Sequence, residues 1–314
     1  MSNKQYDTLI IGPVSLDHNI DYEGREHHET SGAIVQSGFA ASRTGNATAL
    51  FTKLNSRDAD IDRVFEASGA DLYWKESQKT TSIQNRYFTA DKETRECKAI
   101  SICDPFLADE FPNISPRIYH LAGLIYGDFS SDLIRDVSER AHRSGGKLAV
   151  DVQCLLRHAE PDGSMIFYDW ADKKTHMKYI DFLKTDAAEA EILSGTSNRA
   201  EAAKILYRWG AREIMITHNT EVLIYDGNKI YTCPIKARNL SGRTGRGDTC
   251  FSGYITERLT KDIPEALLFA AALVSLKMET VGPFKGNRGD VEAYIRTFYS
   301  EETMKNEEAG YEAE

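Results

Sequence analysis

The feature that most limits the fold of this 314-residue chain is a repeated alternation of short apolar runs with helical patterns. Residues 118–124, 148–152, 179–184 and 213–217 are the apolar runs, and we expect them to be strands. Residues 132–144, 186–193 and 200–209 show helical spacing and lie between these runs. Parallel strands need such crossover helices and are covered on both faces. The alternation therefore predicts an α/β fold around a mostly parallel sheet.

The rest of the chain adds to this sheet at both ends. Residues 6–11 predict a first strand, and residues 38–54 predict a helix followed by a strand. Residues 221–233 predict a hairpin with its turn at Asp226-Gly227-Asn228, and residues 264–281 predict an alanine-rich helix.

Two segments do not fit the alternation. Residues 17–31 are polar and rich in histidine, and residues 80–103 alternate polar and apolar side chains around Ala90-Asp91-Lys92. Such segments predict a loop or hairpin and a half-exposed hairpin, which together would form a small β appendage. We expect one domain over residues 1–300 that includes both segments, and an acidic, flexible tail over residues 301–314.

Composition excludes some classes of function. The formal net charge is −10, which argues against a nucleic-acid partner, because such partners require clustered Lys and Arg. The chain shows no signal-peptide pattern and no run of about 20 apolar residues, so we expect no membrane partner and a cytoplasmic location. The five cysteines form no C-x-x-C pair and are odd in number, which favours reduced thiols.

A glycine-rich stretch carries the chemistry. It reads Gly242-Arg243-Thr244-Gly245-Arg246-Gly247-Asp248-Thr249 and precedes a segment with helical spacing. Glycines before a helix let several backbone N–H groups converge, and the helix N-terminus adds partial positive charge, so the stretch predicts an anion hole.

Two known loops fail to match this stretch. Compared with a Walker A loop, Asp248 replaces the lysine, and a carboxylate there is suited to accept a proton from an attacking hydroxyl. A dinucleotide fingerprint fails because Cys250 occupies the third glycine position, which makes a dinucleotide-dependent oxidoreductase a weak rival. From these residues alone, Asp248 is either such a base or a helix cap.

At this point the chain resembles the ribokinase, or PfkB, family of carbohydrate and nucleoside kinases over about residues 7–287. The late family motif D-T-x-G-A-G-D-T-F corresponds to residues 242–250. The resemblance implies that Asp248 is the catalytic base and that Gly245, Arg246 and Gly247 surround the anion hole. Gly242 replaces the leading Asp, which leaves binding of a monovalent cation near this loop unsupported, and Arg246 replaces a small residue and adds a positive charge.

The resemblance also implies an acceptor site. The early family motif G-G-x-x-x-N-x-A corresponds to residues 31–38, with Gly32 kept and Gln36 in place of asparagine. Asp17 matches the aspartate that binds hydroxyl groups. Arg86 and Arg157 are candidates to meet an acidic substrate, although a solvated surface arginine is the alternative at each position.

The donor side follows from three further matches. The N-x-x-E motif corresponds to residues 186–189, which implies a role for Asp186 beside the nucleotide and for Glu189 near Mg²⁺; a capping box is the alternative for this pair. Residues 214–219 match the strand and loop that hold the nucleotide, and residues 281–283 match a wall of the adenine pocket. The residues expected to bind nucleotide are Asp186, Thr217, Asn219, Thr244, Gly245, Gly247 and Gly282.

Together these matches imply a ribokinase-like three-layer sandwich with a small β lid. They imply ATP and Mg²⁺ as cofactors and transfer of phosphate to a hydroxyl of a sugar or sugar-like molecule, with inositol, ribose, a keto-sugar acid and a nucleoside all open. A nucleoside kinase of the same fold and a non-catalytic sugar or nucleotide sensor are the alternatives. The lid could also mediate a homodimer, and the His27-His28 pair is expected to be exposed on it rather than to bind a metal.

Overall fold

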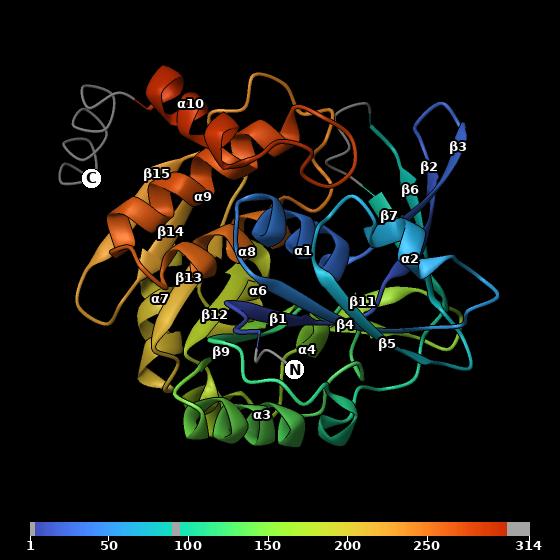
Figure 1. The fold of residues 1–314 in the computed structure, drawn as a ribbon, viewed down its shortest axis with the longest axis horizontal. Helices are drawn as coiled ribbons and strands as arrows, with labels where there is room; N and C mark the ends of the chain where they lie inside the picture. The colour runs from blue at the N-terminus through green and yellow to red at the C-terminus, as the bar shows by residue number, and fades with distance from the viewer. Residues whose placement is uncertain (1–3, 90–94, 300–314) are drawn as a thin grey trace.

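The computed structural model describes residues 4–89 and 95–299, which form a three-layer α/β/α arrangement with a smaller sheet beside it (Figure 1). The central sheet has nine strands in the order β15-β14-β13-β12-β9-β8-β1-β4-β5. Neighbours from β13 to β5 pair in parallel, and β14 and β15 extend the sheet as an antiparallel hairpin. The strands are β1 (Thr8–Ile11), β4 (Thr48–Leu54), β5 (Asp71–Glu76), β8 (Ile118–Leu121), β9 (Lys147–Asp151), β12 (Phe182–Asp186), β13 (Glu213–Thr217), β14 (Glu221–Tyr225) and β15 (Ile230–Pro234). The expected α/β class and mostly parallel sheet are confirmed.

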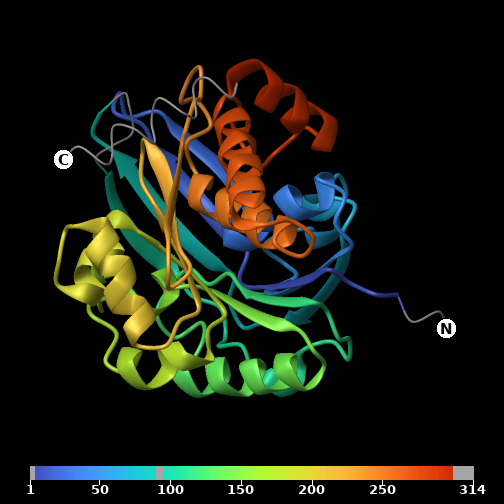
Figure 2. The same ribbon diagram turned by 90° about the vertical axis from the view of Figure 1, so that its left-hand side faces the viewer.

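Helices cover both faces of this sheet, as Figure 2 shows edge-on. One layer contains α1 (Ala33–Arg43), α8 (Arg246–Glu257), α9 (Ile263–Met278) and α10 (Arg288–Phe298); the other contains α3 (Ser131–Arg143), α6 (Ala187–Ser194) and α7 (Arg199–Arg208). Side chains alternate along the strands, so Leu148 and Val150 enter the core under α3 and α7, while Ala149 enters the core under α8 and α9. Burial on both faces explains the almost continuous apolar runs in the sequence. Within the described ranges, none of the helices has the length and apolar character needed to cross a bilayer.

The two segments outside the alternation form the lid. This four-stranded sheet has the order β3-β2-β6-β7 and consists of β2 (Ser15–Ile20), β3 (Glu26–Ser31), β6 (Thr81–Tyr87) and β7 (Arg95–Ser101). Both expected hairpins are present, and β2 pairs with β6 in parallel to join them. The turn expected at 90–92 and the tail expected at 301–314 lie outside the described residues.

Several elements were not expected from the sequence. They are β5, α10, the short helices α2 (Ile61–Phe65), α4 (Gln153–Leu156) and α5 (Lys173–His176), and the hairpin of β10 (Arg157–Ala159) and β11 (Met165–Phe167). Strand β5 is an edge strand with an exposed second half, and α10 buries only Val291 and Tyr294. Both therefore have weak apolar patterns. The alanine-rich helix ends at Met278, three residues earlier than expected.

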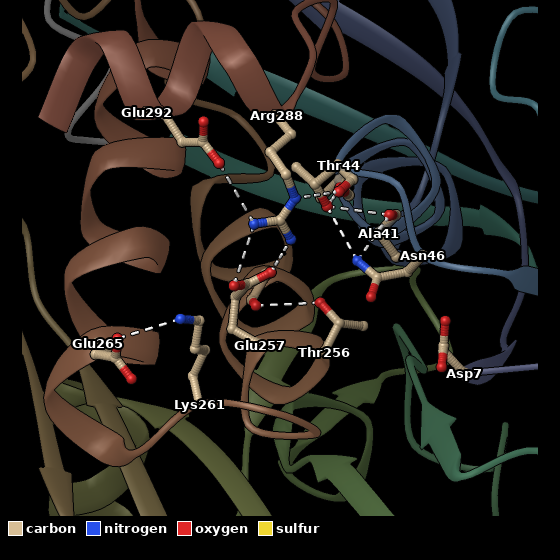
Figure 3. Close-up of polar contacts among 12 residues, drawn as sticks. Asp7, Ala41, Thr44, Asn46, Thr256, Glu257, Lys261, Glu265, Arg288 and Glu292 are labelled. Atoms are coloured by element: carbon tan, nitrogen blue, oxygen red, sulfur yellow. Dashed lines mark hydrogen bonds and ion pairs between the residues drawn. The ribbon is translucent and has the colours of Figure 1, made fainter.

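One arginine joins three helices of the layer that contains α1, α8, α9 and α10, as the close-up in Figure 3 shows. Arg288 on α10 donates from Nε to the Thr44 carbonyl at the end of α1 (2.9 Å), and its two terminal nitrogens contact the Glu257 carboxylate. Glu257 is buried in the last turn of α8, so this contact supplies the counter-charge that a buried carboxylate needs. It fixes the far end of the helix that begins at the glycine-rich loop.

Candidate active site

The candidate site lies at the carboxyl ends of the parallel strands. Strands β1 and β8 are neighbours, yet the chain leaves β1 toward β4 and leaves β8 toward β9, so their ends form a switch point where ligands bind in open α/β sheets. Strands β9, β12 and β13 end at Asp151, Asp186 and Thr217 on the same edge. A cavity of about 350 Å³ lies there, between the glycine-rich loop and the lid.

The cavity gathers most of the expected residues. Those lining it include Asp17, Gly32, Gln36, Arg157, Asp186, Thr217, Thr244, Gly245, Arg246, Gly247 and Asp248. Residues that the sequence analysis did not single out also line it, among them Ser15, Asn85, Tyr87, Arg95, Gln153, Lys184 and Arg243.

The glycine-rich loop leads directly into α8. Gly245 is the N-cap residue, with φ at +77°, and no side chain caps the helix. A Cβ atom at residue 245 would collide with the Gln36 side chain, so glycine is needed both for the left-handed conformation and for the close approach. Asp248 is the third residue of α8, inside its first turn. The helix-cap interpretation of Asp248 is therefore wrong, and its carboxylate lies where the helix dipole favours negative charge.

Buried charges surround Asp248. Burial, followed by the nearby Asp151 carboxylate, raises the pKa of Asp248, while Lys184, Lys277 and Arg157 oppose the rise. Lys184 itself donates from Nζ to Asp151 Oδ2 at 2.8 Å, and both side chains are buried. A carboxylate with a raised pKa is a better proton acceptor than an ordinary one, as general-base catalysis requires.

The acceptor side contains two oxygens without a partner. Among the described residues, Asp17 Oδ1 and Gln36 Oε1 are buried and receive no hydrogen bond. Burial is the largest of the effects that raise the pKa of Asp17 to about 6. Buried polar atoms are nearly always satisfied, so two unsatisfied acceptors at one cavity fit a ligand that donates hydrogen bonds.

The two candidate arginines differ. Arg157 is buried, donates from Nε to the Leu124 carbonyl at 2.8 Å and lines the cavity, so the surface interpretation is wrong for this residue. Arg86 is exposed and does not line the cavity, whereas its neighbours Asn85 and Tyr87 do. Because side chains alternate along β6, Arg86 points to the opposite face of the lid, and we do not retain it in the acceptor site. The same alternation could have identified Asn85 and Tyr87 from the sequence.

Asp186 and Glu189 form the capping box that was the alternative for this pair. The Glu189 amide donates to Asp186 Oδ1 and the Asp186 amide donates to Glu189 Oε2, both at 2.8 Å. Asp186 nevertheless lines the cavity, so it offers an oxygen ligand beside the glycine-rich loop. Glu189 lies behind it, and burial, opposed by Lys184, raises its pKa. The residues present fit Mg²⁺ at Asp186, with Glu189 as the residue that orients it.

The nucleotide-side expectations divide in the same way. Thr217 is buried at the end of β13 and lines the cavity, but Asn219 is exposed and lines neither this cavity nor the next. Thr244 and Gly282 line a second cavity of about 440 Å³ between the loop and the tip of the lid. We therefore do not retain Asn219 in the site.

Histidines on the lid form a separate group. His28 is exposed, as expected, and its ring stacks on that of His18, with Glu26 close to both. The two ring nitrogens of His18 are within hydrogen-bonding distance of Glu26 (3.0 Å) and Gln84 (3.3 Å). These three side chains form a cluster on the outer surface of the lid, separate from the cavity that contains Asp248.

The pKa of Asp17 gives a testable pH dependence. Its pKa is raised to about 6, so the carboxylate is ionised above pH 6 and accepts hydrogen bonds, and it becomes protonated below. We expect the Kd of the acceptor, measured by calorimetry without donor, to rise about tenfold between pH 7 and pH 5. In Asp17→Asn the binding should be weaker at pH 7 and independent of pH over this range. A wild-type affinity that is constant from pH 7 to pH 5 would contradict the role of Asp17.

Comparisons with known proteins agree with this geometry. Residues 39–287 match the family described as pfkB family carbohydrate kinase. A pyrophosphate-dependent kinase of the ribokinase family, solved with a pyrophosphate analogue and myo-inositol, is 34% identical, with a TM-score of 0.82 over 91% of this chain and 99% of that chain. Ribokinase from Arabidopsis thaliana, solved with ribose and ATP, shares the fold at 15% identity, with a TM-score of 0.75 over 93% of this chain and 99% of that chain. A cytidine kinase from Thermococcus kodakarensis is 23% identical over 79% of this chain and 87% of its own length. The chain belongs to the pfkB family of carbohydrate kinases and has a ribokinase-like fold.

Proposed function

We propose that this kinase transfers a phosphoryl group from pyrophosphate to a hydroxyl of a small cyclic polyol such as myo-inositol, with Asp248 as the general base. The observation that carries the proposal is the set of cations on the donor side. Arg243, Arg246 and Lys184 all line the cavity that also contains Asp248. The relatives that are 34% identical and dependent on pyrophosphate support the choice of donor.

Charge explains why these cations favour pyrophosphate. Pyrophosphate has no base or ribose, so its affinity must come from cations and N–H groups that neutralise a compact anion. Arg246 is half-buried at the first position of α8, in a place where the family motif has a small residue. Its planar guanidinium can donate two parallel hydrogen bonds to phosphate oxygens, which a small residue cannot do. ATP, the donor expected from the sequence, depends less on such a cation because its nucleoside adds contacts.

The acceptor side suits a ring with several hydroxyl groups. Asp17 Oδ1 accepts from a hydroxyl, Gln36 can accept and donate, and Arg157 and Asn85 can donate. Neighbouring hydroxyls of a polyol can each donate to and accept from such groups. The solved relative with myo-inositol and the related inositol kinase, 32% identical over 93% of this chain, support this class.

The chemistry follows from these positions. The acceptor hydroxyl lies beside Asp248, which takes its proton as the oxygen attacks the nearer phosphorus of pyrophosphate. The bond from that phosphorus to the bridging oxygen breaks, so the products are the polyol phosphate, inorganic phosphate and one proton. The amides of the loop and Arg246 stabilise the charge on the transferring group. Mg²⁺, held through Asp186, would neutralise further phosphate charge.

A turnover panel tests the proposal. Pyrophosphate and ATP would each be combined with myo-inositol, ribose, a keto-sugar acid and cytidine, at fixed Mg²⁺. We expect kcat/KM for pyrophosphate with myo-inositol to exceed every ATP combination by at least about 100-fold, or roughly 3 kcal/mol of transition-state stabilisation. A higher kcat/KM with ATP would overturn pyrophosphate as the donor. A preference for cytidine would support the alternative of a nucleoside kinase. Binding of these compounds with no turnover in any combination would support the alternative of a non-catalytic sensor. A cytoplasmic location and a homodimer through the lid are parts of the same proposal.

A further inference from the structure

A buried lysine behind the phosphate loop has no place in the mechanism above. Lys277 lies in the last turn of α9 and is 1% exposed. Its ammonium donates to the Gly242 carbonyl at 2.8 Å and to the Thr244 carbonyl. Both acceptors belong to the glycine-rich loop, more than 30 residues earlier in the chain. A cation held by backbone carbonyls is also how proteins hold monovalent metal ions.

These contacts determine the direction of the loop amides. In a trans peptide, the C=O and the following N–H point in opposite directions. Because the carbonyls of Gly242 and Thr244 point to Lys277, the N–H groups of Arg243 and Gly245 are directed to the opposite side of the loop. Arg243 and Gly245 both line the cavity that contains Asp248. Lys277 thus contacts the loop on the side opposite to these two amides, in a position to hold their orientation.

The start of the loop is fixed to the same helix end. The Gly242 amide donates to the Met278 carbonyl at 2.7 Å. A Cβ atom at residue 242 would collide with the Thr280 carbonyl, so the aspartate of the family motif does not fit here. The contact of Lys277 with the loop therefore depends on Gly242. Because Gly242 has no side chain, the loop can approach the end of α9 closely enough for its carbonyls to reach the ammonium.

The ammonium also acts on the base. Lys277 lowers the pKa of Asp248, while burial lowers the pKa of Lys277 itself to about 8, an effect that Asp248 on α8 and Glu29 on β3 oppose. No carboxylate is within hydrogen-bonding distance of its Nζ in the described part of the chain, so loop carbonyls are its hydrogen-bond partners. Burying a charge is costly unless it is paired or hydrogen-bonded, so these two loop carbonyls provide the hydrogen bonds that the buried ammonium needs.

We propose that Lys277 is a positioning residue whose ammonium occupies the place of a monovalent cation beneath the phosphate loop, so that phosphoryl transfer needs no added K⁺ or NH₄⁺. This inference rests on the proposed kinase reaction, and it deepens that reaction by naming what holds the anion hole in its active form.

The test uses the full chain with whichever donor and acceptor give turnover. Wild-type kcat should change less than twofold when K⁺ replaces tetramethylammonium at constant ionic strength. In Lys277→Met, we expect kcat to fall at least about 100-fold, because small displacements of positioned groups have effects of that size. Addition of NH₄⁺ or K⁺ should raise the kcat of Lys277→Met at least tenfold. Lys204→Met, which changes an exposed lysine on α7, is the matched control and should behave as wild type.

Other readouts separate positioning from folding. Lys277→Arg keeps the charge, so it should retain more activity than Lys277→Met. In the wild type, we expect kcat to fall above about pH 8, where Lys277 loses its proton. In Lys277→Arg, this fall should move to higher pH. The proposal is overturned if K⁺ raises the kcat of the wild type tenfold or more. This measurement needs only the wild type, so it remains valid even if Lys277→Met does not fold. The proposal is also overturned if folded Lys277→Met keeps kcat within threefold of wild type, or if its lost activity returns with neither cation. Failure of the kinase proposal itself is recognised separately, by the absence of wild-type turnover in the full donor and acceptor panel.

Discussion

Replacement of Asp248 by asparagine is expected to lower kcat by about 10²–10⁴-fold, the range that general-base catalysis contributes. Asparagine keeps the size of the side chain but cannot take the proton from the acceptor hydroxyl. Stability should not fall. Burial and Asp151 raise the pKa of Asp248, so its ionised form is disfavoured in the folded state, and a neutral residue removes that cost.

Steady-state kinetics and thermal unfolding of the same samples measure both effects. Asp132→Asn removes a carboxylate whose side chain is 74% exposed on α3, and it should leave kcat unchanged. A loss of activity with an unchanged or higher Tm in Asp248→Asn supports a catalytic carboxylate. Turnover within threefold of wild type would exclude Asp248 as the base.

Replacement of Arg246 by alanine is expected to lower kcat/KM for pyrophosphate by about 10²–10³-fold, the effect of removing one donor that stabilises transition-state charge. The guanidinium lines the cavity at the start of α8, close to where the transferring group lies in the proposed mechanism. The affinity for the acceptor should change less than threefold, because Arg246 belongs to the donor side.

Kinetics with varied pyrophosphate and calorimetry with the acceptor distinguish these effects. Arg246→Lys keeps one charge without the planar pair of donors, so it should recover part of the loss. Arg208→Ala changes an arginine whose side chain is 62% exposed on α7, and it should have no effect. Equal losses for pyrophosphate and ATP would show that Arg246 serves any phosphoryl donor, whereas no loss with pyrophosphate would contradict its role.

Much of the fold could be predicted because its strands are buried on both faces. The run at Glu213–Thr217 becomes β13, and the two irregular segments become the lid hairpins. Elements at the margins were missed for the opposite reason. Strand β5 lies at the edge of the sheet and α10 buries few side chains, so neither shows a strong apolar pattern.

The site was predictable where a motif determines local geometry. Glycines around Asp248 do form a loop before a helix, and Asp17 and Gln36 do face the same cavity. Where two interpretations were possible, the residues alone did not decide between them. Asp248 proved to be half-buried and Arg157 buried at the cavity, whereas Arg86 proved to be exposed on the other face of the lid.

By itself, the sequence determined the alternation of strands with helices and the glycine-rich loop before α8, because hydrophobic periodicity and closely spaced glycines act over short stretches of chain. Only the tertiary structure decided which distant charges meet at that loop. Lys184 on β12 pairs with Asp151 on β9, and Lys277 reaches the loop from α9. These contacts depend on the order of the strands and on the close packing of α9 against Gly242. No local pattern in the sequence shows the strand order or this packing, because a buried lysine and an exposed lysine are the same residue type in a sequence.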